Sequence, residues 1–152
     1  MTIYIYTYSG IRSPKPQKGK VAYRLVAEKE VKGADGLKHA EVVKDTGIMT
    51  AETEGTWNEA ALTAVLMALK ELKEPIGCKW FIYTDSLYFE TNWAKGFERQ
   101  KNKWLKSDGT RYAYAEQWWD EITRILNECT RPIVSRGDHI YTKEMAEAVK
   151  TA

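Results

Sequence analysis

The stretch WFIYTDSLY (Trp80 to Tyr88) has the pattern of a β-strand that ends in an acid. It has a close sibling at the start of the chain, TIYIYTYSG (Thr2 to Gly10). Residues 78–84 are nearly all apolar, as in a strand buried on both faces. Residues 2–8 alternate isoleucine with tyrosine, which also favours a strand. Both carry Ile-Tyr-Thr, but the next residue is Asp85 in one and Tyr8 in the other. Whether the protein is an enzyme depends on this difference.

A helix is predicted between these two strands. TWNEAALTAVLMALKEL (Thr56 to Leu72) carries its apolar residues at helical spacing. Thr56 is placed as the N-cap, and Glu59 three residues later has capping-box spacing. A strand–helix–strand order predicts that the two strands pair in parallel. Tyr8 and Asp85 are therefore expected side by side at one pole of the sheet.

The remaining elements follow from the same patterns. A proline- and glycine-rich loop occupies residues 10–19, and Asp35-Gly36 marks a hairpin turn. Further strands are predicted at residues 21–31, 40–49 and 131–137, and further helices at 112–128 and 141–150. The order predicts one α/β domain over residues 1–152. Its mixed five-stranded sheet, three antiparallel strands and then two parallel ones, is flanked by helices.

Composition favours a soluble globular protein, with 43% apolar and 29% charged residues among 152. No apolar run approaches the roughly 20 residues of a membrane helix, and no secretory leader is visible. We expect no membrane association and a cytoplasmic location, with Cys78 and Cys129 as buried thiols. The net charge is only +2. Cations nevertheless cluster in residues 12–24 and 95–111, which indicates either a side that faces a polyanion or a merely solvated surface.

Taken in order, these motifs resemble a type 1 ribonuclease H along nearly the whole chain. TDS at Asp85 matches the motif at the end of that family's fourth strand, and Glu59 stands where its first long helix carries a glutamate. Residues 91–110, TNWAKGFERQKNKWLKSDGT, resemble the family's basic protrusion. IVSRGDH (Ile133 to His139) resembles the last strand and the loop after it. The resemblance implies a ribonuclease H-like fold.

The resemblance implies an endonuclease that cuts the RNA strand of an RNA–DNA hybrid. Two divalent metals, Mg²⁺ or Mn²⁺, would be held by four acids. Glu59 and Asp85 match two of the four. Tyr8 stands at the position of the first-strand acid, and its neutral phenol is a poor metal ligand. The last-helix acid falls on Thr142, Met145 or Ala146, depending on the gap. The candidate catalytic residues are Glu59, Asp85 and Asp138, and the candidate metal ligands are Glu59, Asp85 and Glu144.

A nucleic-acid interface is predicted on the protrusion and on the turn before the first helix. Cations there would neutralise phosphates, and the tryptophans would either pack on sugars and bases or anchor the protrusion to the domain. The resemblance implies that the turn meets the minor groove of the hybrid. The candidate residues are Thr56, Asn58, Trp93, Lys95, Arg99, Lys101, Lys103, Trp104 and Lys106.

Three functions remain open on the sequence. The first is a hybrid- or duplex-binding protein with a degenerate active site, in which hydrolysis is reduced or lost and no metal is needed. The second is an active ribonuclease H with a rearranged site that uses Mg²⁺ or Mn²⁺. The third is a partner-binding module like the connection domain of a reverse transcriptase. Glu59 and Asp85 also have a structural reading, in which each only caps a helix.

Overall fold

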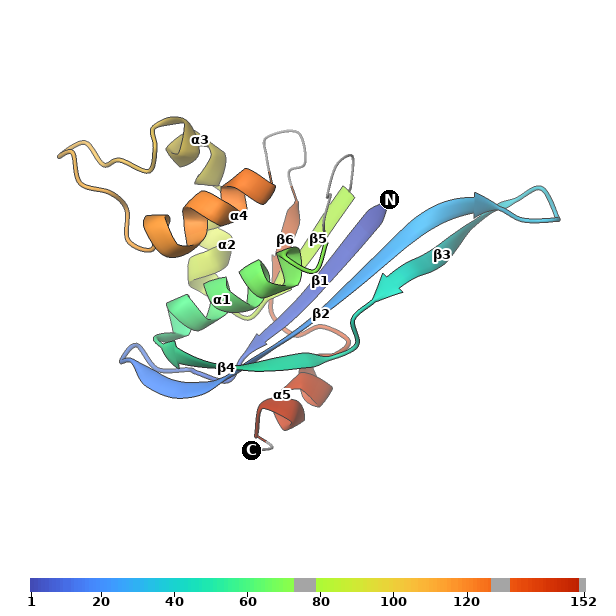
Figure 1. Cartoon of the computed structure of the whole chain (residues 1–152), viewed down its shortest axis with the longest axis horizontal. Coiled ribbons are helices and arrows are strands. Elements are labelled where there is room, and N and C mark those ends of the chain that lie inside the picture. Colours follow the sequence, from blue (N-terminus) through green and yellow to red (C-terminus); the bar gives the residue numbers. More distant parts are fainter. Residues whose placement is uncertain (73–78, 127–131, 151–152) are drawn as a thin grey trace.

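The central strand of the sheet is β1 (Thr2–Ser9), which lies between β2 (Gln17–Lys32) and β5 (Lys79–Thr84). The computed structural model describes residues 1–72, 79–126 and 132–150. β1 is antiparallel to β2 and parallel to β5, and β6 (Ile133–Arg136) continues the sheet in parallel beside β5. Figure 1 shows this mixed sheet with helices against it. The predicted ribonuclease H-like fold class is confirmed.

The edge of β2 that faces away from β1 pairs with two strands, where the sequence predicted one. β3 (Lys38–Asp45) pairs with the second half of β2, and β4 (Met49–Gly55) pairs with its first half. Between them, Leu25 N–H donates to Thr46 Oγ1 at 3.0 Å, and Gly47 has a φ of +67°. This turn divides the strand predicted at residues 40–49, so the described sheet has six strands rather than five. β2 and β3 run on together as a long hairpin beyond the helices (Figure 1).

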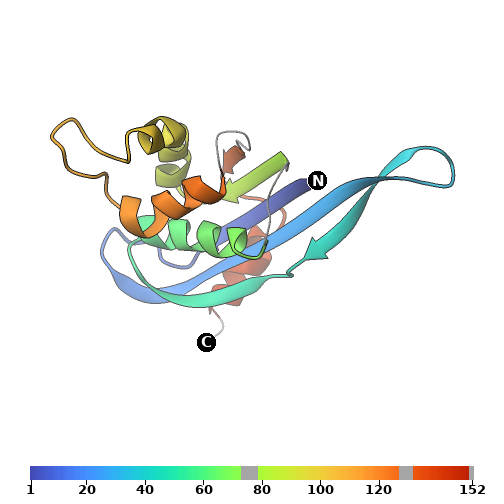
Figure 2. The same ribbon diagram turned by 45° about the horizontal axis from the view of Figure 1, so that its top comes forward.

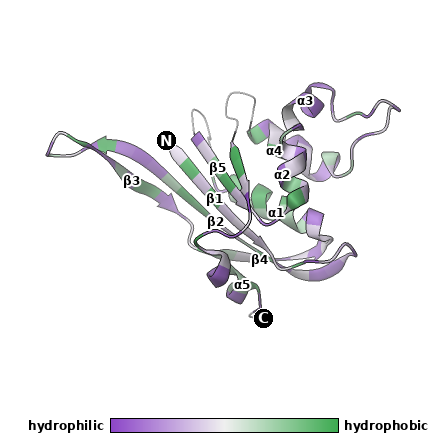
Figure 3. Ribbon diagram, turned by 180° about the vertical axis from the view of Figure 1, so that it is seen from behind, coloured by the Kyte–Doolittle hydropathy of each residue, from purple (hydrophilic) through white to green (hydrophobic). Residues whose placement is uncertain are grey.

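Helix α1 (Trp57–Leu69) covers one face of the sheet and begins at the predicted cap. Thr56 Oγ1 accepts from Glu59 N–H, and Glu59 Oε1 accepts in turn from Thr56 N–H. Leu62, Val65 and Leu69 are fully buried against the isoleucines of β1. Figure 3 shows hydrophobic residues along α1 and β5. The alternation of β1 therefore turns Ile3, Ile5 and Thr7 toward α1 and its tyrosines to the other face.

Three further helices lie on the α1 side, and α5 (Thr142–Lys150) packs against β1 and β2 from the opposite face (Figure 2). The three are α2 (Leu87–Trp93), α3 (Gly96–Lys101) and α4 (Asp120–Ile125). The helix predicted from residue 112 starts later, as a π-helical turn η1 (Ala115–Trp119) that runs into α4. Tyr114, with a φ of +66°, sets this later start.

Cys78 and Cys129, which were predicted to be buried thiols, both lie outside the described part of the chain. Among the residues that are described, no helix is long and apolar enough to cross a membrane.

Candidate active site and nucleic-acid interface

The ends of β1 and β5 lie side by side, as the sequence predicted. Their parallel register pairs Tyr6 with Tyr83, which brings Tyr8 level with Asp85. Ser9 N–H donates to Asp85 Oδ2 at 3.1 Å, and Thr7 Oγ1 donates to the Tyr83 carbonyl at 2.8 Å. The first bond holds the carboxylate at the strand end, and the second joins the two strands just before it. Ser86, not Asp85, caps α2 through a bond from Phe89 N–H at 3.1 Å, so the capping reading of Asp85 is wrong.

Asp85 has a cationic partner within the chain. Arg12 Nη2 donates to its Oδ2 at 2.7 Å, and Arg12 Nε donates to the Ser9 carbonyl at 3.2 Å. The Asp85 side chain is only 13% exposed, while that of Arg12 is 42% exposed. Burial raises the pKa of Asp85, and the Ser9 N–H and the Arg12 charge offset this rise only in part. The one acid at these two strand ends is thus already paired.

Two aromatic rings hold the Arg12 guanidinium in this position. Its central carbon lies 4.6 Å from the centroid of the Tyr8 ring and 5.1 Å from that of the Trp57 ring. Cations are attracted to the faces of such rings at these distances. We call Tyr8, Arg12, Trp57 and Asp85 the strand-end site. Sequence reasoning counted Arg12 only as one member of a basic run and therefore missed its role here.

Glu59 completes the helix cap that the sequence allowed as its structural reading. Its Oε1 accepts from both the backbone N–H and the hydroxyl of Thr56, at 3.2 Å each. The preceding glycine lets the carboxylate approach the chain, because a Cβ on Gly55 would lie 3.2 Å from Glu59 Oε1 and Gly55 has a φ of +154°. The carboxylate of this candidate ligand is therefore engaged at the start of α1.

The loop after β6 contributes a histidine rather than an acid to this pole. His139 Nδ1 accepts from Tyr141 N–H at 3.1 Å, so its Nε2 carries the proton and donates to the Thr7 carbonyl at 3.0 Å. Burial lowers the pKa of His139, and the Thr7 carbonyl and the Asp85 and Asp138 charges oppose this in part. Asp138, predicted as catalytic, is itself exposed.

The last helix does not bring its candidate ligand to Asp85. Glu144 is exposed, and its charge acts on Arg24, a residue of β2 whose guanidinium is paired with Asp45. Met145 is fully buried, and Ala146 carries no ligand atom. Within residues 1–72, 79–126 and 132–150, no group of three or more His, Cys, Asp or Glu side chains is placed to hold a metal ion.

The two tryptophans predicted to contact a nucleic-acid strand are instead buried. Trp104 is 1% exposed and stacks on Trp119 with 5.3 Å between ring centroids. Trp93 is 7% exposed and stacks on Phe89 at 6.4 Å. Strand contact is therefore the wrong reading for both, and the other reading, that they anchor the protrusion to the domain, agrees with their burial. Their place among cations in the sequence had suggested an exposed surface.

The protrusion's cations divide into two groups. Arg99 is half-buried, donates to Asn92 Oδ1 at 2.5 Å and lies 4.2 Å from the Tyr112 ring centroid. The lysines of the other group are exposed, namely Lys95, Lys101, Lys103 and Lys106. The turn residues Thr56 and Asn58 are half-buried beside Glu59. The exposed lysines are the ones able to meet phosphates.

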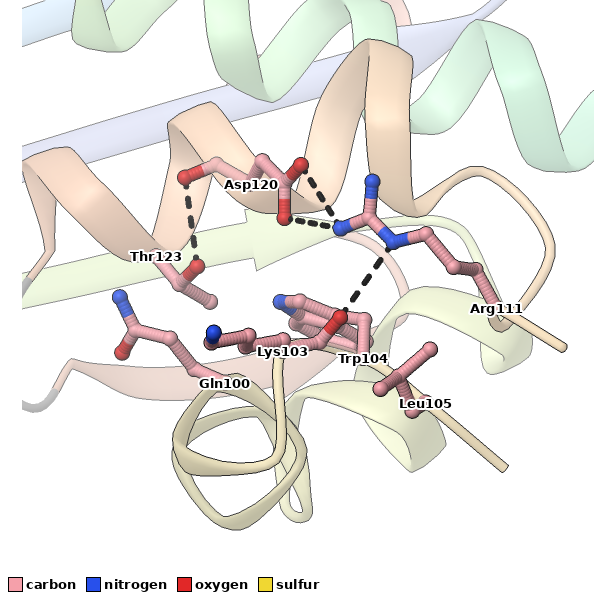
Figure 4. Close-up of a pocket in the computed structure, with 7 residues that line it drawn as sticks. All are labelled: Gln100, Lys103, Trp104, Leu105, Arg111, Asp120 and Thr123. Carbon is pink, nitrogen blue, oxygen red and sulfur yellow. Dashed lines mark hydrogen bonds and ion pairs between the residues drawn. The ribbon is translucent and has the colours of Figure 1, made fainter. Parts of the chain in front are cut away.

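A hollow of about 530 Å³ lies where the protrusion meets α4 (Figure 4). Arg111 spans it: its Nη2 donates to Asp120 Oδ1 and Oδ2 at 2.7 and 2.8 Å, and its Nε donates to the Lys103 carbonyl. Lys103 and Trp104 on its wall both have positive φ, 55° and 57°. Such backbone conformations persist when surrounding contacts hold them, and the bond from Arg111 Nε to the Lys103 carbonyl is one such contact.

Comparison with known proteins places the chain in a family. The RNase H family model matches residues 2–132, so the chain belongs to the RNase H family. It is 41% identical over 71 residues to the ribonuclease H of Thermoanaerobacter sp. (strain X514), covering 44% of this chain and 43% of that protein. It is 40% identical over 94 residues to that of Rickettsia bellii (strain RML369-C), covering 58% and 57%. The chain spans about half the length of these curated relatives.

Solved structures show the same fold. A foamy viral protease-reverse transcriptase in complex with dsDNA matches with a TM-score of 0.63 and 19% identity, covering 99% of this chain and 90% of that chain. LC9-RNase H1, described as a type 1 RNase H with the type 2 active-site motif, matches with a TM-score of 0.61 and 17% identity, covering 99% and 71%.

Divalent metals are usual in this family, and the donor set here can be tested against them. Hard cations such as Mg²⁺ require several oxygen ligands around one point. At the strand ends, Tyr8 offers a ring face to Arg12, and Asp85 is bonded to Arg12 and Ser9. Glu59 is bonded within its helix cap. As arranged, these residues do not fit a two-metal centre.

Proposed function

We propose that this chain is an RNase H-family domain that binds an RNA–DNA hybrid or a related duplex, and in which hydrolysis of the RNA strand is reduced or lost. One observation carries the proposal: the strand-end site presents an arginine–aspartate ion pair beside a tyrosine. Two-metal hydrolysis of the kind the family resemblance implies requires several carboxylates at this place to hold the metal ions.

Binding is supported by the exposed lysines of the protrusion. Lys95, Lys101, Lys103 and Lys106 project from a segment anchored by Trp93 and Trp104. Each phosphate contact made by such a lysine releases condensed counterions, which gives affinity without base specificity. Thr56 and Asn58, at the start of α1, add hydrogen-bonding groups that could distinguish a 2′-hydroxyl. The interface would therefore recognise the shape of a duplex rather than its base sequence.

Reduced hydrolysis is supported by charge balance at the strand ends. Two-metal cleavage needs one cation to activate water and another to stabilise the leaving oxygen. Here the Asp85 charge is already met by Arg12 at 2.7 Å. A guanidinium remains protonated in proteins and cannot deliver a hydroxide. The site as arranged therefore does not favour cleavage of the RNA strand.

The proposal is tested by fluorescence anisotropy with a labelled RNA–DNA hybrid in the presence of EDTA. We expect saturable binding without metal that weakens steeply as salt rises. The Lys101→Glu/Lys103→Glu variant should bind much more weakly, whereas Lys38→Glu, on the distant hairpin, serves as the matched control and should bind normally.

The proposed interface would be overturned if the chain did not bind the hybrid. It would also be overturned if neither added salt nor the lysine substitutions weakened binding. Cleavage of the RNA strand after addition of Mg²⁺ or Mn²⁺ would instead support the active enzyme. In that case the Glu59→Gln variant should abolish the rate.

A further inference from the structure

Two hydrogen bonds and two aromatic rings hold Arg12 in place. Its Nη2 reaches Asp85, its Nε reaches the Ser9 carbonyl, and its guanidinium lies over two rings. The contacts come from separate parts of the chain: the end of β1, the residue that follows β5, and the first turn of α1. Three elements thus converge on one positive charge at the pole of the sheet.

The residue types around Arg12 suit a monovalent organic cation. Tyr8 and Trp57 offer ring faces, which attract a guanidinium but lack the oxygen ligands that Mg²⁺ requires. One acid, Asp85, balances one positive charge. A carboxylate in place of Tyr8 would leave a net negative charge there that one arginine could not neutralise. Tyr8 and Arg12 are therefore two parts of one arrangement.

We propose that Arg12 is a resident cation that takes the place of a divalent metal beside Asp85, with Tyr8 and Trp57 as its aromatic supports. It closes this pole to Mg²⁺ and Mn²⁺, because a second cation would meet the guanidinium charge at the same carboxylate oxygen. This inference rests on the proposed function at one point, the expectation that the chain binds a duplex without a divalent metal. It assigns Arg12 a positioning role toward Asp85 and no catalytic step.

The test measures metal binding alone, without nucleic acid. Mn²⁺ is added to the wild-type chain, and the free-ion signal is followed by electron paramagnetic resonance. We expect the wild type and the control Lys15→Gln, an exposed cation of the same loop, to bind no Mn²⁺ at millimolar concentrations. The Tyr8→Asp/Arg12→Gln variant places a second acid at the strand ends and removes the cation. Its affinity for Mn²⁺ should be at least tenfold higher than any that the wild type shows.

Equal Mn²⁺ affinity in the wild type and the double variant would overturn the proposal. So would a double variant that is folded by circular dichroism yet gains no affinity. If that variant does not fold, the wild type alone decides the matter through amide NMR. Selective broadening of the Ser9, Arg12 and Asp85 signals by Mn²⁺ would contradict the proposal, and its absence would support it. Failure of hybrid binding leaves this readout unaffected, so the two proposals fail separately.

Discussion

The strand-end site and the basic protrusion (residues 91–110) are built from the same residue types but use them in opposite ways. In the protrusion, Trp104 is 1% exposed, and the lysines around it are exposed. At the strand ends the partly exposed Arg12 lies against the rings of Tyr8 and Trp57 and pairs with Asp85, whose side chain is only 13% exposed. Aromatic residues near cations anchor structure in the first case and hold a charge in the second. The sequence pattern alone does not separate these two uses.

The largest effect is expected from removing the anchor of the protrusion. Trp104→Ala deletes a fully buried ring that stacks on Trp119. The free energy of unfolding should fall by about 3–5 kcal/mol, as for other buried aromatic truncations. Urea unfolding measures it, with Lys106→Ala as a control expected to stay near the wild type. A loss below about 1 kcal/mol would show that Trp104 is not an anchor.

A smaller loss is expected when the strand-end site loses its cation. Arg12→Ala leaves the Asp85 carboxylate with the Ser9 N–H but no counter-charge. We expect a loss of about 1–2 kcal/mol, below the cost of breaking a fully buried pair because Arg12 is partly exposed.

A double-mutant cycle with Asp85→Asn isolates this pair. Losses that simply add would mean that the two side chains are not coupled. Lys15→Ala, on the same loop, should change stability by less than about 0.5 kcal/mol.

The pH dependence of stability should distinguish the half-buried His139 from the exposed His39. Because burial lowers the pKa of His139, the unfolded chain binds a proton that the folded chain resists. The resulting stability is complete above the unfolded pKa of about 6.5 and is lost as pH falls toward the folded value. His139→Gln should reduce the loss of unfolding free energy that occurs as the pH falls below about 6.5.

Urea titrations across this range measure the slope. His39→Gln is the matched control, since the His39 side chain is exposed and its Nε2 bonds to Asp35. An unchanged slope in His139→Gln would show that the imidazole is not held neutral.

The smallest effect is expected from the Tyr8 hydroxyl. Tyr8→Phe keeps the ring over Arg12 and should change stability by less than about 0.5 kcal/mol. Tyr8→Leu removes the cation–π contact and should cost about 0.5–1 kcal/mol more. Equal losses in both variants, measured by thermal unfolding, would mean that the ring does not support the arginine.

The order of elements was predictable because hydrophobic periodicity dictates it. Isoleucines alternating in β1 and apolar residues at helical spacing in α1 gave both elements and the cap at Thr56. β4 was missed because its residues are mostly polar and half or fully exposed, so no apolar alternation marks it.

The site was predictable only in part, because its partners come from contacts across the fold. Asp85 and Glu59 were found from their motifs. Arg12 lies 73 residues from Asp85 in sequence, and nothing local marks their pairing. The burial of Trp93 and Trp104 was likewise hidden, since surrounding lysines suggested an exposed surface.

The central claim, that this RNase H-family chain holds a duplex without cutting it, is tested most directly by one cleavage assay. An RNA–DNA hybrid with an end-labelled RNA strand is saturated with protein in Mg²⁺, and separately in Mn²⁺, beside the Glu59→Gln variant. Binding is followed in the same samples. We predict that the RNA stays intact while the hybrid is bound. RNA cleavage that disappears in Glu59→Gln would contradict the account and show that the strand-end site opens to metal.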